Sequence, residues 1–225
     1  MKHVIFDFDG TLVDSLPVVV RIANQVVPQL NIDDHELAKI REMPAREIIK
    51  YSGIPNWQLL RLIIKGKKIM AQHLDELKLF KGIDAVIVDL HKKDFKLSVV
   101  SSNSEENIRK VLKSEGVEEY FTGVYGNVGL FSKARVFKTV LKDMHISASQ
   151  AIYVGDEVRD IEAARKIPID VISVTWGYNG EQILKKYKPT YLAKTLQQLQ
   201  TVLTETIAAW DYIVFTLAPL NLSTT

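Results

Sequence analysis

The chain has 225 residues, of which 47% are hydrophobic and 25% are charged, and its formal net charge is +2. This composition is typical of a folded globular protein and excludes a disordered or fibrous chain. The small net charge argues against nucleic acid as a partner, because dedicated nucleic-acid-binding proteins usually carry a strong positive field. Cysteine is absent, which excludes disulfides, thiolate catalysis and zinc–thiolate sites and fits a reducing compartment.

The first apolar run of the chain covers residues 4–6 and ends at Asp7. It has the β-branched and aromatic residues of a buried strand. It is far too short for a secretory signal or a membrane-spanning helix. We therefore expect a cytoplasmic protein that makes no membrane contact.

A long segment separates this first strand from the next convincing core strand, which begins near Lys96. A connection between strands normally needs only a few residues and one helix, so the length indicates an insertion. Between residues 16 and 80 the pattern is wholly helical, and Pro17, Pro44 and Pro55 each suit the start of a helix. We expect an all-helical cap domain at residues 16–80, inserted into a core formed by residues 1–15 and 81–225.

In the rest of the chain, apolar runs that predict strands alternate with helical patterns. Strands are expected at residues 97–100, 151–154 and 171–174, with a weaker candidate at 123–126 that glycines border. Helical patterns occupy residues 105–114, 134–144, 158–167 and 181–187. This alternation predicts an α/β fold whose core is a Rossmann-like, doubly wound parallel sheet.

Two carboxylates, Asp7 and Asp9, directly follow the first strand. Open α/β sheets bind ligands at the carboxyl ends of their strands, and side chains two residues apart on an extended segment point to the same side. Gly10 then permits a sharp turn. A simple turn that caps the next helix is the competing interpretation, and it applies most strongly to Asp14 and Ser15.

A second acidic turn, at residues 155–160, follows the strand at 151–154 and opens a helix. Acidic residues in a first helical turn can be simple partners of the helix dipole. Together with the first motif, however, they supply the carboxylate oxygens that Mg²⁺ prefers. We predict Asp156 as a direct metal ligand, with Asp160 behind the ligands as a supporting residue.

Ser101 ends the strand at 97–100, before a helix whose N-terminal amides can hold an anion. An ordinary helix cap is the competing interpretation for this serine. Lys133 begins the helix that leads to the Asp156 strand, where its ammonium could reach an anion over the edge of the sheet. Arg135 and Lys138 are the competing basic residues on that helix.

In this order, the four segments resemble the motifs of the haloacid dehalogenase superfamily, specifically its phosphoglycolate-phosphatase-like branch. The resemblance spans roughly residues 2–203, and the stretch 174–178 also resembles the segment after the last core strand in that branch. It implies a Mg²⁺-dependent phosphoric monoester hydrolase that acts on a small phosphorylated metabolite. Phosphoglycolate or a sugar phosphate would be plausible substrates.

The same resemblance implies a role for each matching residue. Asp7 would attack phosphorus and form an aspartyl phosphate, while Asp9 would protonate the leaving alcohol and then activate water. Ser101, the backbone amide of Ser102, and Lys133 would bind the phosphoryl oxygens. The metal would be held by the Asp7 side chain, the Asp9 carbonyl oxygen and Asp156. These roles agree with the chemistry of phosphoryl transfer, which depends on positioning and on neutralising charge around the equatorial oxygens.

Two alternative functions remain open. A phosphosugar mutase would use the same core but return the phosphoryl group to its substrate. A non-catalytic binding protein would keep only the fold, although every expected catalytic position is filled. Dehalogenases of the superfamily lack an acid two residues after the nucleophile, so Asp9 disfavours that chemistry. One departure from the branch is Ala134, where a proline usually follows the lysine.

The cap carries a mild excess of basic residues, which suits an organic phosphate with further negative charge. Arg46 is the predicted contact to the leaving group, because related caps present an arginine near this position. Lys65, Lys67 and Lys68 are interpreted as parts of a solvated face. The apolar tail from Thr206 is expected to pack on the core or to form a homodimer contact.

Overall fold

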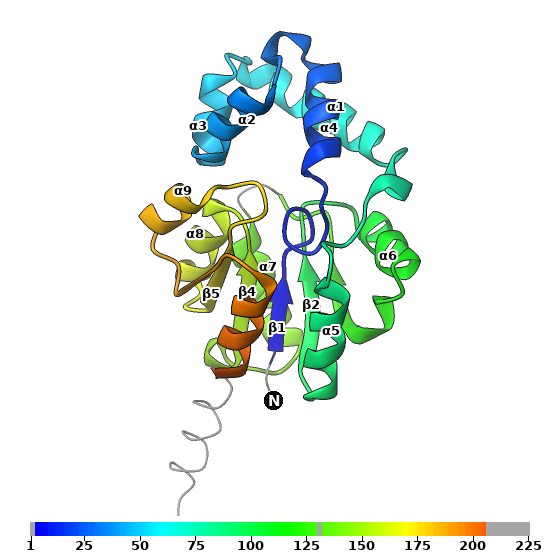
Figure 1. The fold of residues 1–225 in the computed structure, drawn as a ribbon, viewed down its shortest axis with the longest axis vertical. Helices are drawn as coiled ribbons and strands as arrows, with labels where there is room; N and C mark the ends of the chain where they lie inside the picture. Colours follow the sequence, from blue (N-terminus) through cyan, green and yellow to red (C-terminus); the bar gives the residue numbers. More distant parts are fainter. Residues whose placement is uncertain (1–2, 130–131, 206–225) are drawn as a thin grey trace, which may run out of the picture.

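The computed structural model describes residues 3–129 and 132–205 (Figure 1). The tail from Thr206, with its expected homodimer contact, lies outside these residues. Within the described part of the chain, no helix is both long enough and apolar enough to cross a membrane.

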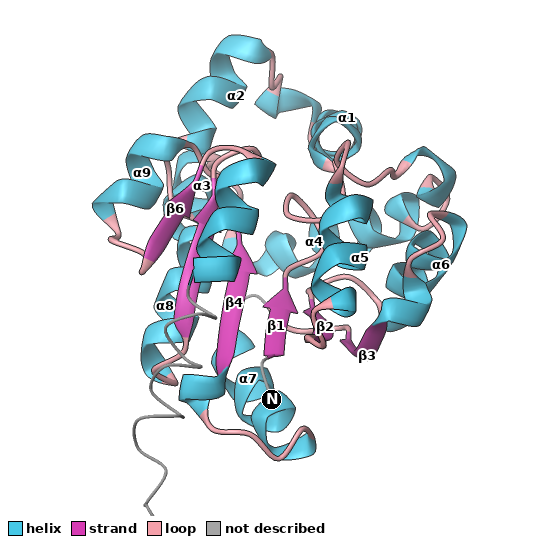
Figure 2. Ribbon diagram, turned by 60° about the horizontal axis from the view of Figure 1, so that its bottom comes forward, coloured by secondary structure: helices cyan, strands magenta, loops and turns pink. Residues whose placement is uncertain are grey.

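Six parallel strands form one sheet in the order β3-β2-β1-β4-β5-β6. They are β1 (His3–Phe6), β2 (Lys96–Val100), β3 (Phe121–Tyr125), β4 (Ala151–Gly155), β5 (Asp170–Val174) and β6 (Tyr191–Ala193). The first strand lies near the middle, between β2 and β4, as Figure 2 shows. Because the strand order reverses here, the carboxyl end of β1 is the place where such sheets bind ligands. The short strand β6 was not predicted, whereas the weak candidate near residue 123 is a strand.

Helices cover both faces of the sheet. The core helices are α5 (Ile83–Lys92), α6 (Glu105–Ser114), α7 (Lys133–Asp143), α8 (Val158–Lys166) and α9 (Glu181–Lys186), and residues 196–205 are also helical. Val4 and Phe6 pack on one face with apolar residues of α5 and α6, while Ile5 packs on the other with those of α7 and α8. This alternation of side chains along a fully buried strand confirms the predicted doubly wound α/β fold.

All helices of the insertion lie above the carboxyl ends of the strands (Figure 1). They are α1 (Leu16–Val26), α2 (Asp34–Arg41), α3 (Ala45–Tyr51) and α4 (Asn56–Met70), with short 3₁₀ turns at Pro28–Leu30 and Leu74–Glu76. Pro17 lies in the first turn of α1, and Pro44 and Pro55 directly precede α3 and α4. Proline is tolerated at these positions because the first amides of a helix lack intrahelical partners. The predicted all-helical cap is confirmed, while its boundaries at residues 16 and 80 stay a prediction.

The segments that enter and leave the cap pair with each other. The amide of Asp14 donates to the carbonyl of Lys78 at 2.9 Å, and that of Phe80 donates to Leu12 at 2.9 Å. An antiparallel bridge joins Val13 to Leu79 between them. The cap is therefore connected to the core by two adjacent segments of the chain, which run antiparallel near the carboxyl end of β1.

His3 is buried in β1, with its Nε2 atom 2.9 Å from the hydroxyl of Ser98 on β2. Burial, with a smaller contribution from Lys96, lowers the pKa of His3 from 6.5 to about 4. Between these values the unfolded chain binds a proton that the folded chain does not. Acidification through this window therefore destabilises the fold.

We expect the free energy of unfolding to fall by about 2 kcal/mol between about pH 7 and about pH 5 through His3 alone. Urea denaturation at several pH values should show this loss in the native chain, and the His3→Gln variant should lose less stability over the same interval. Equal losses in the two proteins would contradict the assignment of this pH dependence to His3.

Candidate active site

Asp7 is placed at the carboxyl end of β1 by the sheet itself. Its amide donates to the carbonyl of Val154 at 2.8 Å, which extends the pairing of β1 with β4. The side chain is buried, and its Oδ1 atom accepts from the amide of Phe8 at 2.7 Å. Its Oδ2 atom accepts from Lys133 Nζ at 2.5 Å. Asp7 is thus a carboxylate held rigidly at both oxygens.

Lys133, the first residue of α7, extends its buried ammonium toward the end of the sheet. Its three donors meet three acceptors: Asp7, Asp160 at 2.5 Å and the hydroxyl of Tyr153 at 2.8 Å. Burial alone would lower the pKa of Lys133, but Asp160 and Asp7 raise it above its ordinary value. The ammonium therefore stays charged.

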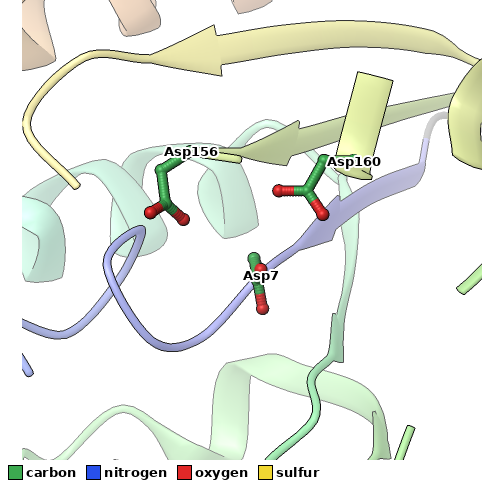
Figure 3. Close-up of side chains that lie close together, drawn as sticks. All are labelled: Asp7, Asp156 and Asp160. Carbon is green, nitrogen blue, oxygen red and sulfur yellow. The ribbon is translucent and has the colours of Figure 1, made fainter. Parts of the chain in front are cut away.

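Two further carboxylates come from the turn after β4 and from the helix α8 that follows it (Figure 3). Asp156 is fully buried and accepts from the hydroxyl of Thr11 at 2.7 Å and from the amide of Tyr178 at 2.7 Å. Asp160, in the first turn of α8, accepts from Lys133 and from the amide of Glu157 at 3.0 Å. One oxygen each from Asp7, Asp156 and Asp160 lie within 4.8 Å of one another.

These buried carboxylates carry more negative charge than Lys133 can balance. Burial raises the pKa of Asp7 to about 7, although Lys133 opposes the shift. Burial, followed by the charges of Glu157 and Asp7, raises the pKa of Asp156 well above its ordinary value. A cation among the oxygens would remove this cost, and an all-oxygen donor set fits Mg²⁺.

Asp9 lies at the same end of β1 and is half-buried. Its Oδ2 atom accepts from the side chain of Asn103 at 3.3 Å, while its buried Oδ1 atom has no hydrogen-bond partner among the described residues. Burial raises its pKa, and the nearby side chains of Ser15 and Asn103 act in the opposite direction. A carboxyl group in this environment is suited to carrying a proton.

Ser101 lies where β2 ends, and its buried hydroxyl accepts from the amide of Asn103 at 3.1 Å. It does not cap α6, because Ser104 does so by accepting from the amide of Asn107. Ser102 follows directly, and its carbonyl accepts from Lys67 Nζ of the cap at 2.6 Å. The sequence interpretation of Lys67 as a purely solvated residue therefore omits this contact with the core.

The structure brings Asp7, Lys133, Asp156 and Asp160 into one cluster. The competing residues Arg135 and Lys138 are exposed instead. Sequence reasoning assigned no site role to Thr11, Asn103, Tyr153 or Tyr178. Two of them had a signal: Thr11 lies inside the first family motif, residues 7–15, and Tyr178 ends the stretch that resembles the family after β5.

The cap stretch around Arg41 contacts the loop after β5. Arg41 donates to the carbonyl of Thr175 at 3.0 Å, and its own carbonyl accepts from the amide of Gly180 at 2.8 Å. The Glu42 carboxylate accepts from the amide of Ile183 at 2.8 Å. This stretch anchors the cap to the core. Arg46 borders a small recess with Lys133 and Arg159, and its contact with the leaving group stays a prediction.

Gly10 permits the turn that brings Thr11 to Asp156. Its φ is +76°, and a Cβ at this position would overlap the Asp156 carboxylate. Gly53 has a similar φ of +64°, but nothing lies within 4 Å of the place its Cβ would occupy. Comparing the two single alanine variants therefore separates the cost of the positive φ, which both share, from the cost of overlap with Asp156, which only Gly10→Ala has.

We expect Gly53→Ala to destabilise the fold by about 1 kcal/mol through backbone strain. Gly10→Ala should cost roughly 1–3 kcal/mol more, because Asp156 must move. We also expect Mg²⁺ to raise the melting temperature of the native chain, and Gly10→Ala should reduce that rise. Urea denaturation and thermal melts with and without Mg²⁺ would measure both effects. Equal losses from the two substitutions would show that Gly10 is required only for its backbone conformation.

Comparison with known proteins agrees with this geometry. Residues 4–174 match the model of the haloacid dehalogenase-like hydrolases. A phosphoglycolate phosphatase of Synechococcus elongatus is 36% identical over 91% of this chain and 98% of its own length. A pyrophosphatase, PpaX of Listeria welshimeri, is 23% identical over 88% of this chain and 94% of its own.

A solved structure, described as a predicted phosphatase from Clostridium acetobutylicum, has the same fold. It superposes with a TM-score of 0.78 at 24% identity and covers 91% of this chain and 98% of its own. Phosphatases are thus among the relatives of this chain. The family expected from the sequence motifs is confirmed: the chain belongs to the haloacid dehalogenase-like hydrolases.

Proposed function

We propose that the protein is a Mg²⁺-dependent phosphatase that hydrolyses a small phosphomonoester through an aspartyl phosphate on Asp7. The observation that carries the proposal is the placement of Asp7. Its carboxylate is buried, fixed by the Phe8 amide and Lys133, and followed two residues later by a half-buried Asp9. The names of the phosphoglycolate phosphatase and pyrophosphatase relatives are consistent with phosphate chemistry.

Two displacements complete the proposed reaction. A carboxylate oxygen of Asp7 attacks phosphorus, the bond to the leaving oxygen breaks, and Asp9 gives that oxygen its proton. Asp9 then takes a proton from water, whose oxygen attacks the same phosphorus and releases inorganic phosphate and free Asp7. The raised pKa of Asp9 supports its role as the acid of the first step.

Positive charge and fixed donors would hold the phosphoryl group during both steps. Lys133 would supply positive charge beside Asp7, since its three donors already meet protein acceptors. The hydroxyl of Ser101 and the amide of Ser102, at the end of the neighbouring strand β2, would supply the donors. Preorganised donors of this kind stabilise the charge on the equatorial oxygens without reorganising. Asp160 would orient Lys133, since both the Glu157 amide and Lys133 fix its carboxylate.

The Asp7 side chain, the Asp9 carbonyl oxygen and Asp156 would hold the metal. Bound there, Mg²⁺ would offset the negative charge of the carboxylates and of the phosphate ester. Thr11 and the Tyr178 amide keep Asp156 in place. The accumulated buried negative charge at this cluster supports the proposed site.

We also propose that residues 16–80 form the cap and residues 1–15 and 81–225 the core. The paired segments around Val13 and Leu79 support boundaries near these positions, because the chain enters the cap through the first segment and returns to the core through the second. A cap over Asp7 would exclude bulk water from the aspartyl phosphate. The lack of cysteine is consistent with the proposed cytoplasmic location.

A panel of phosphomonoesters, assayed with Mg²⁺ or with EDTA, should show phosphate release only when the metal is present. Asp7→Asn should reduce release to background because the nucleophile is lost. Asp9→Asn should reduce it by roughly 10²–10⁴-fold because proton transfer is lost. Lys138→Met, an exposed lysine on the same helix as Lys133, is the matched control and should retain activity.

Rapid-quench experiments with a ³²P-labelled ester distinguish the remaining alternatives. A phosphatase should pass its label from Asp7 to water within one turnover. A mutase would keep the phosphoenzyme in water and discharge it only to a phosphosugar. A protein that neither releases phosphate nor acquires label from any ester would contradict the proposal and favour the binding-protein alternative.

A further inference from the structure

A cavity of about 370 Å³ lies between the cap and the core above Asp9. Its wall on the cap side is almost wholly apolar and comes mainly from α1 and α4, through residues such as Val19, Ile22 and Ile63. Val27, Leu30 and Ile54, from the segments between these helices, complete the apolar wall. Asp9, Ser102, Asn103 and Tyr178 form the core side. The leaving group of a phosphomonoester would enter this space, because Asp9 is the proposed donor to the leaving oxygen.

Lys67 is the only basic side chain among the described residues that line this cavity. It projects from α4, and its ammonium donates to the carbonyl of Ser102 at 2.6 Å. An ammonium has three donors, so two stay available for another acceptor. The side chain is also exposed, which leaves it accessible to an entering ligand.

The contact with Ser102 fixes the ammonium beside the acid of the reaction. Ser102 directly precedes Asn103, and Asn103 donates to Asp9. The same Ser102 carries the amide proposed to bind phosphoryl oxygens. A substrate that bridges Asp7 and Lys67 would therefore extend from the phosphoryl site, past Asp9, to the one basic side chain among the described residues of the cavity lining.

We infer that Lys67 recognises an anionic group on the leaving part of the substrate, which makes the substrate a small phosphorylated acid. This inference rests on the proposed phosphatase function and specifies its substrate class. Lys67 supplies charge-assisted donors for the anion, and no other basic side chain among the described residues lines this cavity. The anion could be a carboxylate or a second phosphate, since both accept from an ammonium.

The test compares phosphorylated compounds of similar size, two esters and one anhydride, that differ in the charge of the leaving group. Phosphoglycolate supplies a carboxylate, pyrophosphate supplies a second phosphate, and 2-hydroxyethyl phosphate supplies a neutral leaving group. For the native protein, kcat/KM should be higher for at least one anionic compound than for the neutral ester. The compound with the greater preference identifies the anion.

Lys67→Met should reduce that preference by at least about tenfold, mainly through a higher KM. Lys67→Arg keeps the charge and should restore part of it. Lys65→Met and Lys68→Met, on the same helix but outside the cavity lining, should leave the preference unchanged. An equal loss on neutral and anionic compounds in Lys67→Met, or no loss on either, would overturn the inference.

Binding to Asp7→Asn, measured by calorimetry with Mg²⁺, separates this inference from the proposed reaction. Tighter binding of phosphoglycolate or pyrophosphate than of the neutral ester, lost when Lys67→Met is added, supports the role of Lys67 even if the native protein releases no phosphate. Lys67-dependent binding without phosphate release would reject the phosphatase function and leave the role of Lys67 supported. Equal affinities for charged and neutral compounds would reject the role of Lys67 while leaving the phosphatase function intact.

Discussion

The buried ammonium of Lys133 is the interaction on which the site depends. It lies between Asp7 and Asp160, with the hydroxyl of Tyr153 as its third acceptor. Removing one partner of such a buried pair leaves an uncompensated charge, which costs far more than the pair itself contributes. The arrangement therefore fixes the relative positions of β1, β4 and α7, and it orients the Asp7 carboxylate at the edge of the sheet.

Even so, the ammonium does not neutralise the cluster. Asp156 is held separately, by Thr11 and by the Tyr178 amide, and its pKa stays raised. The fold thus keeps one buried carboxylate, Asp156, without a hydrogen bond to a cationic side chain among the described residues. Such an excess of negative charge is costly without a ligand and favourable with a divalent one, so stability and metal binding are coupled here.

The cap contacts the core on two sides. Around Arg41, one main-chain hydrogen bond joins the cap to Gly180, and the Arg41 and Glu42 side chains add hydrogen bonds to the segment after β5. The loop after β5 also supplies the Tyr178 amide to Asp156. On the other side, Lys67 donates to the carbonyl of Ser102, and Lys78 donates to the Glu115 carboxylate. The loop that holds Asp156 is therefore itself held by the cap.

The sequence by itself determined the fold class, the helical insertion and the acidic strand ends. Apolar runs of strand length need burial on both faces, and prolines mark helix starts by their missing donor, so these features are local. The family motifs likewise identified Asp7, Asp9, Asp156 and Lys133 as candidates, while the short strand β6 left too weak a pattern to predict.

Only the tertiary structure decided which side chains meet. Lys67 resembled its solvated neighbours, and Thr11 is an ordinary turn residue until the chain brings Asp156 beside it. These contacts join residues that are distant in the chain, and their energies depend on burial and geometry that no local pattern encodes.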